Sequence, residues 1–239
     1  MINAKDRLIV ALDYPTLEDA KGLVETLGDA VSVYKVGLEM FLNSKGEAVS
    51  YLNGLGKKIF LDLKFHDIPN TTTMASVFAA KQDVFMFNVH AGGGKAMMSS
   101  VAERVKEISP ETLAIAVTVL TSFSEEEVSE HFATNLNIKE LAMHWAKATK
   151  ESGMDGVVCS PWEAAAIKEV CGESFKTICP GVRPQWAAAN DQKRIMTPKK
   201  AIENGCDFLV VGRPITKAAN PVEAAKLVMA EINEALVQG

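Results

Sequence analysis

Charged residues lie inside or at the ends of several short apolar runs, where a charge is costly unless it is paired. Asp62 and Lys64 alternate with leucine and phenylalanine, and Asp67 follows three residues after Lys64. Asp13 ends an earlier apolar run, and Lys35 lies within another. A lysine held between carboxylates stays protonated, so it can donate a proton or stabilise developing negative charge. One such pair could serve only as a structural ion pair, whereas two lysines and several acids at one place favour a reactive site.

Eight short apolar runs, each followed by an amphipathic or polar stretch, fill the chain. Their β-branched residues lack polar alternation, which indicates parallel strands covered by helices. We predict strands over residues 8–12, 31–36, 58–63, 84–89, 113–119, 156–159, 175–179 and 208–211. We predict helices over residues 16–27, 46–55, 72–81, 95–108, 138–151, 198–204 and 221–236, with Pro161 as a first helical residue after the sixth strand. This pattern predicts a (β/α)8 TIM barrel; an open doubly wound sheet is the alternative, but no GxGxxG turn follows the first strand.

The length and composition fit one globular unit. A chain of 239 residues is close to the length of one (β/α)8 barrel, so we predict a single catalytic domain over residues 1–239. The hydrophobic fraction of 48% and the charged fraction of 23% are near the globular average and allow a sizeable core. The net charge of -5 argues against non-specific binding to nucleic acid, which depends on basic surfaces.

The cysteines and the apolar segments bear on location and on metal binding. Cys159, Cys171, Cys179 and Cys206 form no CxxC pair, so we predict reduced, buried thiols rather than a zinc site or a disulfide framework. No stretch approaches the roughly 20 apolar residues that a membrane helix needs. We therefore predict a cytoplasmic protein that does not bind a membrane.

The predicted strands place the charged residues at one end of the barrel. Functional groups in such barrels gather at the carboxyl ends of the strands. Residues two apart on a strand share a face, so the alternation predicts that Asp62 and Lys64 both point into the barrel. Asp67 lies beyond the predicted strand end, where by itself it could be a loop acid or a helix cap. Asp13 is in phase with interior positions of the first strand.

Two glycine-containing segments are suited to binding a phosphate group. Residues 180–184 follow the seventh predicted strand, and Gly212 and Arg213 end the eighth. Phosphate sites in these barrels are often built from the loops after strands seven and eight, with backbone amides and arginine as donors. The stretch over residues 181–197 is long for a barrel loop, which predicts a lid over that phosphate.

Several segments together resemble one known family. The run Leu-Asp-Leu-Lys-Phe-His-Asp-Ile-Pro-Asn-Thr at residues 61–71 is similar to the signature of the orotidine 5′-phosphate decarboxylase family. It occurs with matching segments at residues 8–13, 34–37, 180–183 and 211–216, all in family order. The resemblance covers nearly the whole chain and implies the same barrel fold.

The resemblance implies a charged array of Lys35, Asp62, Lys64 and Asp67 that converts orotidine 5′-monophosphate to uridine 5′-monophosphate in de novo pyrimidine biosynthesis. Lys64 is then the proton donor to C6 of the pyrimidine, and Asp62 lies near the substrate carboxylate. Lys35 connects the ribose side with the array. The resemblance implies no cofactor and no metal.

The resemblance also implies how the nucleotide binds. Asp13 is expected to bind ribose hydroxyls and Thr121 the pyrimidine, although neighbouring Ser122 is an open alternative for the latter. Asp67, with Ile68 and Thr71, is expected to reach the site of the neighbouring subunit of a homodimer. The residues expected around the phosphate are Arg183, Gln192, Gly212 and Arg213.

Two other functions share part of this pattern, and two histidines lie at strand ends. A magnesium-dependent sugar-phosphate decarboxylase or aldolase-type enzyme of the same barrel group shares the Asp-x-Lys-x-x-Asp pattern, but it has a carboxylate where this chain has Lys35. A non-catalytic nucleotide-phosphate binder is the alternative from another class, which the intact charged array disfavours. His66 and His90 lie at strand ends, where we expect packing or orientation rather than acid–base chemistry.

Overall fold

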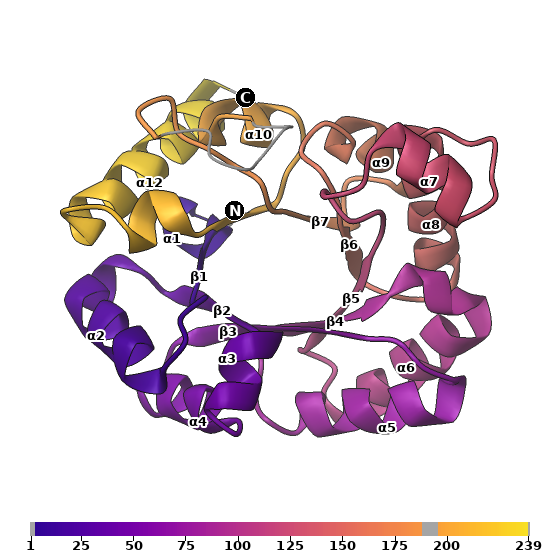
Figure 1. Cartoon of the computed structure of the whole chain (residues 1–239), viewed down its shortest axis with the longest axis horizontal. Helices are drawn as coiled ribbons and strands as arrows, with labels where there is room; N and C mark the ends of the chain where they lie inside the picture. The colour runs from indigo at the N-terminus through magenta and orange to yellow at the C-terminus, as the bar shows by residue number, and fades with distance from the viewer. Residues whose placement is uncertain (1–2, 188–195, 239) are drawn as a thin grey trace.

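The computed structural model describes residues 3–187 and 196–238, in which eight parallel strands close into a barrel with neighbours in sequence order. Figure 1 shows the strands around the centre and the helices outside them. The strands are β1 (Leu8–Ala11), β2 (Val33–Gly37), β3 (Lys58–Phe65), β4 (Met86–His90), β5 (Leu113–Val117), β6 (Gly156–Val158), β7 (Lys176–Cys179) and β8 (Phe208–Val211). The predicted (β/α)8 barrel is therefore confirmed.

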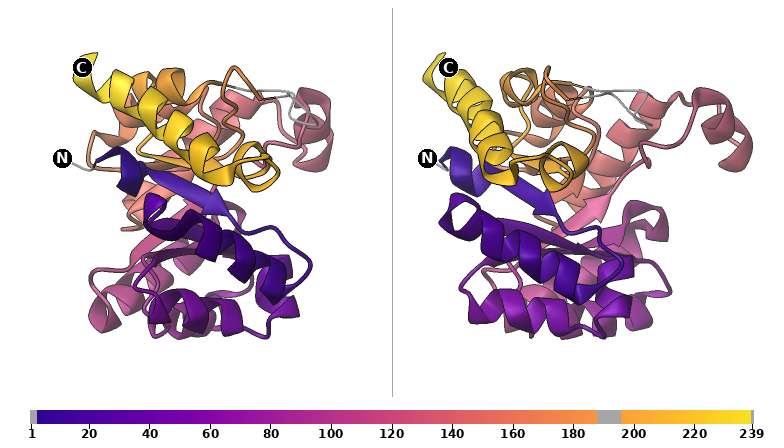
Figure 2. Two further views of the ribbon diagram at one scale, coloured as in Figure 1. Left: turned by 90° about the vertical axis from the view of Figure 1, so that its left-hand side faces the viewer. Right: turned by 60° about the vertical axis from the view of Figure 1, so that its left-hand side comes forward.

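One short helix precedes β1, and the other helices lie between consecutive strands or follow β8. They are α1 (Ala4–Arg7), α2 (Leu17–Leu27), α3 (Leu38–Asn43), α4 (Glu47–Gly54), α5 (Pro69–Ala80), α6 (Gly94–Ile108), α7 (Glu125–His131), α8 (Ile138–Glu151), α9 (Ala164–Cys171), α10 (Pro198–Glu203), α11 (Arg213–Thr216) and α12 (Pro221–Gln238), with 3-10 turns η1 (Gly28–Ala30) and η2 (Ala91–Gly93). Figure 2 shows the two chain ends on one side of the barrel and α7 on the side toward which β1 points. No helix among the described residues is long and apolar enough to cross a membrane.

Two apolar layers hold the barrel together. Side chains such as Ile9, Phe60 and Ile178 fill its interior, while the larger cluster lies between the strands and the surrounding helices. Every residue of β1 is buried, because one face of the strand packs inside the barrel and the other against the helices. This double burial explains the continuous apolar runs of the sequence.

The structure corrects several predicted boundaries. A short helix, α3, precedes the predicted helix at residues 46–55, and α7 occupies part of the polar stretch after β5. Ser124 and Glu127 form a reciprocal capping box that starts α7. Pro161 is not a first helical residue, because α9 begins only at Ala164, after a turn. The third strand continues to Phe65, past its predicted end at residue 63.

Candidate active site

A chain of alternating charges lies at the carboxyl ends of β1, β2 and β3. Lys35 Nζ donates to Asp13 Oδ1 at 2.9 Å and lies 3.4 Å from Asp62 Oδ2. Asp62 Oδ1 in turn accepts from Lys64 Nζ at 2.7 Å. The order Asp13–Lys35–Asp62–Lys64 therefore alternates acid and base, so that each inner group lies between two groups of opposite charge.

The array fixes the charge states of its two buried members. Burial lowers the pKa of the Lys35 ammonium, but Asp62 and Asp13 outweigh burial and raise that pKa above its ordinary value. Burial raises the pKa of the Asp62 carboxyl, but Lys35 and Lys64 outweigh it and lower that pKa. At neutral pH Lys35 is therefore a cation and Asp62 an anion.

Gly37 makes room for the first ion pair of the array. A Cβ atom at this position would lie 2.9 Å from Lys35 Nζ and 3.4 Å from Asp13 Oδ1. The Lys35 ammonium group would have to shift to avoid that contact. Glycine at the end of β2 thus allows the lysine to bend back toward β1.

The strand that carries Asp62 and Lys64 is irregular where these residues lie. Leu61 pairs with Phe87 of β4 and Phe65 pairs with Val89, so residues 62–64 lie opposite a single residue. Lys64 has a backbone φ of 51°, in the left-handed region that residues other than glycine rarely adopt. The two side chains meet as predicted, but across a bulge rather than by the regular alternation on which the prediction rested.

Asn88 is a member of this site that the sequence interpretation missed. It is the residue opposite the bulge, and its side chain is fully buried. Asn88 Nδ2 donates to Asp62 Oδ1 at 2.7 Å, and Asn88 Oδ1 accepts from the backbone N–H of Lys64 at 2.7 Å. A sequence signal was available, because Asn88 interrupts an apolar run in phase with the interior residue Met86.

The array opens into a cavity of about 200 Å³ whose remaining walls are mostly apolar. Lys35, Asp62 and Lys64 line one part of it, and Thr121, from the loop after β5, lines another. Apolar walls exclude water and strengthen the field of the charged groups on whatever occupies the cavity. Thr121 therefore lines the same cavity as Lys35, Asp62 and Lys64, and its predicted contact with a pyrimidine stays a prediction.

Asp67 lies apart from the other three members of the predicted array. It is exposed, and its Oδ1 accepts from the backbone N–H of Ile68 at 2.7 Å. Within the described residues, the ion pairs of the array join Asp13, Lys35, Asp62 and Lys64 but do not include Asp67. Ile68 and Thr71 are exposed beside it. Its predicted role across a subunit interface stays a prediction.

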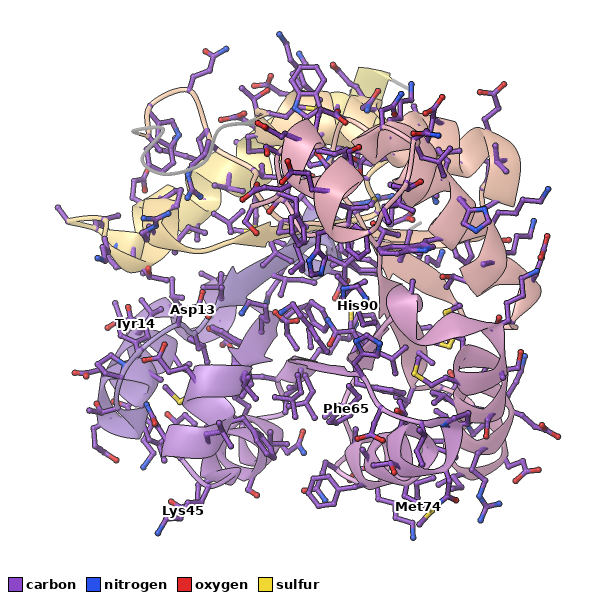
Figure 3. The ribbon with its side chains drawn as sticks, turned by 45° about the vertical axis from the view of Figure 1, so that its right-hand side comes forward. Asp13, Tyr14, Lys45, Phe65, Met74 and His90 are labelled. Atoms are coloured by element: carbon purple, nitrogen blue, oxygen red, sulfur yellow. The ribbon has the colours of Figure 1, made fainter. Side chains whose placement is uncertain are left out.

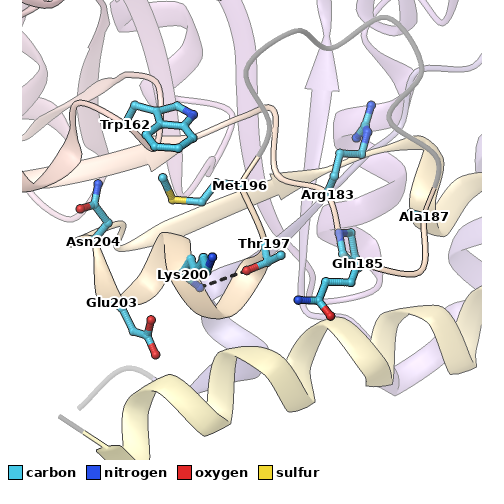
Figure 4. A pocket seen from close by; sticks show the side chains of 10 residues that line it. Trp162, Arg183, Gln185, Ala187, Met196, Thr197, Lys200, Glu203 and Asn204 are labelled. Atoms are coloured by element: carbon cyan, nitrogen blue, oxygen red, sulfur yellow. Dashed lines mark hydrogen bonds between the residues drawn. The ribbon is translucent and has the colours of Figure 1, made fainter.

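The predicted phosphate residues that the structure describes lie on the segments that follow β7 and β8. Arg183 is buried and lines another cavity, of about 630 Å³, with Trp162, Gln185 and Lys200 (Figure 4). Gly212 precedes α11, and Arg213 is its first residue. Gln192 and residues 188–195 of the predicted lid lie outside the described residues.

The two histidines form a stacked pair next to the bulge. The rings of His66 and His90 lie 5.2 Å apart at an interplanar angle of 14°, and Trp145 meets His90 edge to face. His90 Nδ1 accepts from the backbone N–H of Gly92 at 3.1 Å. Burial, with the charges of His66 and Lys64, lowers the pKa of His90 to about 4. A neutral ring that stacks and accepts a backbone hydrogen bond fits the predicted packing or orienting role.

All four cysteines are buried free thiols, as predicted. Within residues 3–187 and 196–238, no group of three or more histidine, cysteine, aspartate or glutamate side chains is arranged to hold a metal ion.

Comparisons with known proteins identify relatives over nearly the full chain. Residues 6–228 match the model of the orotidine 5′-phosphate decarboxylase / HUMPS family. An orotidine 5′-phosphate decarboxylase from Syntrophomonas wolfei is 46% identical over 239 residues, covering 98% of this chain and 100% of the relative. One from Gloeothece citriformis is 45% identical, with 98% and 100% covered.

Solved structures show the same likeness in three dimensions. The crystal structure of orotidine 5′-phosphate decarboxylase from Lactobacillus acidophilus superimposes with a TM-score of 0.85 at 37% identity, covering 95% of this chain and 98% of that one. An uncharacterized conserved protein from Geobacillus kaustophilus superimposes with a TM-score of 0.82 at 36% identity, covering 95% and 100%.

Proposed function

The chain belongs to the orotidine 5′-phosphate decarboxylase / HUMPS family, and we propose that it converts orotidine 5′-monophosphate to uridine 5′-monophosphate in de novo pyrimidine biosynthesis. The observation that carries the proposal is the charged array of Asp13, Lys35, Asp62 and Lys64 at the mouth of the barrel. The mostly apolar cavity beside it, which Thr121 also lines, supports the proposal because a flat, partly apolar base could bind there.

The reaction requires stabilisation of negative charge on carbon. When the bond between C6 and the carboxyl carbon breaks, its electron pair stays on C6, which has no adjacent electron sink. Fixed charges in a cavity with little water can supply the stabilisation without a cofactor. The Lys64 ammonium then transfers a proton to C6 as carbon dioxide leaves, and the neutral amine is reprotonated from water.

Asp62 serves the reaction in two ways. It accepts from Lys64 Nζ at 2.7 Å and so holds the proton donor in place. Its negative charge also lies where the substrate carboxylate would approach, and two anions repel each other. Because the repulsion falls as neutral carbon dioxide departs, Asp62 disfavours the bound substrate more than the transition state.

The other predicted residues bind the nucleotide away from the reacting carbon. Asp13 accepts from Lys35 and has an exposed side chain, so its carboxylate can also bind ribose hydroxyls. Thr121 contacts the pyrimidine in this proposal. Binding energy from the remote phosphate lowers the barrier when it holds the base against Lys64. We propose that Arg183, Gly212 and Arg213 bind the phosphate; the roles of Gln192 and of the lid over residues 181–197 stay predictions, because residues 188–195 lie outside the described residues.

Exposed apolar side chains support a homodimer. Ile68 is 67% exposed before α5, and Met74 (58%) and Phe78 (50%) lie on the exposed side of that helix. Figure 3 shows Met74 at the outer surface of the barrel. Leu38 and Leu42 of α3 are also exposed. Apolar surface of this kind marks protein contacts, and we propose that a second copy covers it so that Asp67, Ile68 and Thr71 complete the neighbouring site.

Loss of the absorbance of orotidine 5′-monophosphate, followed with purified protein in EDTA, tests the proposed activity. We expect turnover without added metal. Activity that appears only with added Mg²⁺ would instead support the magnesium-dependent decarboxylase or aldolase-type enzyme. Stabilisation by the nucleotide without turnover would support a non-catalytic binder.

Mixing two inactive variants tests the shared site. Lys64→Ala and Asp67→Asn each disable one group, but a mixed dimer contains one site in which both groups are wild type. We expect the mixture to regain part of the wild-type activity, while each variant alone stays inactive. If mass spectrometry shows mixed dimers that remain inactive, Asp67 does not act across the interface.

A further inference from the structure

Asn88 lies at the one place where the pairing of β3 with β4 breaks. Three residues of β3, 62–64, lie opposite Asn88 alone, whereas Leu61 and Phe65 pair regularly with Phe87 and Val89 on either side. Bulges of this kind interrupt the hydrogen bonds between strands and redirect the side chains of the bulged strand. Both Asp62 and Lys64, the reactive pair of the proposed function, are within this bulge.

The bulge leaves the backbone of Lys64 in a costly conformation. Its φ of 51° costs a residue with a side chain about 1–2 kcal/mol relative to ordinary strand geometry. The Lys64 N–H does not pair with the backbone of β4; instead Asn88 Oδ1 accepts it at 2.7 Å. The asparagine amide therefore replaces the missing backbone acceptor and holds the strained residue in place.

The same amide also holds the carboxylate of Asp62. Asn88 Nδ2 donates to Asp62 Oδ1 at 2.7 Å, and this oxygen also accepts from Lys64 Nζ at 2.7 Å. The amide has one working orientation, because rotating it by half a turn would oppose N–H to N–H and oxygen to carboxylate. Since the amide is planar and its side chain is fully buried, the two hydrogen bonds fix both partners relative to β4.

We propose that Asn88 is a positioning residue for the decarboxylation, which aligns the Lys64 ammonium and the Asp62 carboxylate by holding the backbone bulge between them. This inference rests on the proposed function and goes beyond it, because Asn88 itself does not line the cavity. A group that acts through alignment affects kcat far more than KM, since a displacement of about 1 Å can cost roughly 100-fold in rate.

Two variants and a matched control test the proposal in the full-length protein. Asn88→Ala removes both hydrogen bonds, and we expect kcat to fall about 100-fold with KM changed no more than about threefold. Met86→Ala is the control, because Met86 is on the same strand, is equally buried and belongs to the apolar interior of the barrel. It should lose stability to a similar degree but keep kcat within about twofold.

Asn88→Asp preserves the side-chain volume and removes the donor to Asp62. Two carboxylates at this distance repel each other, so the introduced acid takes up a proton more readily than usual, and only its protonated form can donate as the amide does. The charged groups facing Asp62 are otherwise Lys35 and Lys64. We therefore expect the deficit in kcat relative to wild type to shrink as the pH falls, whereas a purely structural role gives a ratio that does not change with pH.

Hydrogen exchange of the Lys64 amide gives a readout that does not depend on activity. The amide should be protected in the wild type and in Met86→Ala, and should exchange faster in Asn88→Ala. If wild type shows no turnover, the proposed function fails, while the exchange result still decides whether Asn88 holds the bulge. Unchanged kcat in both Asn88 variants, or unchanged exchange at Lys64, would overturn the proposal.

Discussion

The barrel has a lysine–aspartate cluster at each end, and the two clusters differ in how their ammonium groups are satisfied. At the amino ends of β7 and β8, Lys168 Nζ donates to Asp207 Oδ2 at 2.6 Å. It also donates to the carbonyl oxygens of Phe175 at 2.8 Å and Glu173 at 2.9 Å. These acceptors use all three donors of a lysine. At the carboxyl ends, Lys64 Nζ has one partner among the described residues, Asp62, and its side chain is 40% exposed.

The two clusters differ in whether the ammonium group can still bind a ligand. Lys168 is buried, and its acceptors join α9 to the segments that lead into β7 and β8. Lys64 lines a cavity and keeps N–H donors available for a ligand. A lysine–aspartate pair can therefore have different roles, because the number of protein acceptors around the lysine ammonium differs between the two clusters.

The largest effect is expected from Lys64→Ala. Removing a proton donor together with a charge that stabilises the transition state should lower kcat/KM at least about 1,000-fold. The fold should remain, because Asp62 keeps Lys35 and Asn88 as partners. Turnover by absorbance and thermal unfolding by circular dichroism measure the two properties separately. A variant that retains a tenth of the activity would remove Lys64 from its proposed role.

Lys168→Met should show the opposite pattern. Breaking a buried ion pair by removing one partner costs about 3–5 kcal/mol, which corresponds to a decrease in Tm of roughly 6–20 °C for a chain of this size. The folded fraction should keep kcat within about twofold, because this end of the barrel contributes to stability. A large loss of kcat in folded Lys168→Met would contradict the division between the two ends.

The double variant Lys168→Met/Asp207→Asn is the control for that prediction. The neutral amide leaves no unpaired buried carboxylate, so part of the lost stability should return. Urea unfolding of the two single variants and the double variant gives the coupling energy of the pair. A coupling energy near zero would show that the two side chains contribute independently.

The sequence predicts the barrel well, because each strand is buried on both faces. Continuous apolar runs such as residues 8–12 and 208–211 lie within a residue of the observed strands. The predicted helix start at residue 16 is also confirmed, since Thr16 caps α2 and its side chain accepts from the backbone N–H of Asp19. Local signals suffice where burial, capping and strand length agree with one another.

The reactive site is less predictable because its geometry depends on contacts between strands. Nothing local to residues 62–64 indicates that they lie opposite one residue of β4 or that Lys64 adopts a φ of 51°. Asn88 is 24 residues away from Lys64 in sequence, and its role becomes visible only when the two strands pair. That Lys35 and Asp62 lie at the same end of the barrel was predictable, whereas the bulge that contains Asp62 and Lys64 was not.

A smaller effect is expected from Thr177→Val at the stabilising end. The buried Thr177 hydroxyl donates to the carbonyl oxygen of Gly205 at 2.8 Å and accepts from the Asp207 N–H at 3.0 Å. Valine keeps the shape but leaves both backbone groups without this partner, at a cost of about 1–3 kcal/mol. Urea unfolding should show the loss, and kcat should not change. A decrease in kcat without a decrease in stability would show that the two ends communicate.

The smallest effect concerns the dependence of stability on pH, which we expect to arise partly at the reactive end. Because the folded-state pKa of His90 is lowered to about 4 from an ordinary 6.5, the unfolded chain binds a proton more readily between these values. The stability contributed by the neutral ring is complete above pH 6.5 and is lost as the pH falls toward 4. His90→Phe keeps a ring against His66 and Trp145 but cannot titrate. Its unfolding free energy in urea should fall less than that of wild type between pH 7 and pH 5, by about 1 kcal/mol once solvent screening of the partly exposed ring is included. Parallel pH curves for the two proteins would place the acid sensitivity elsewhere in the molecule.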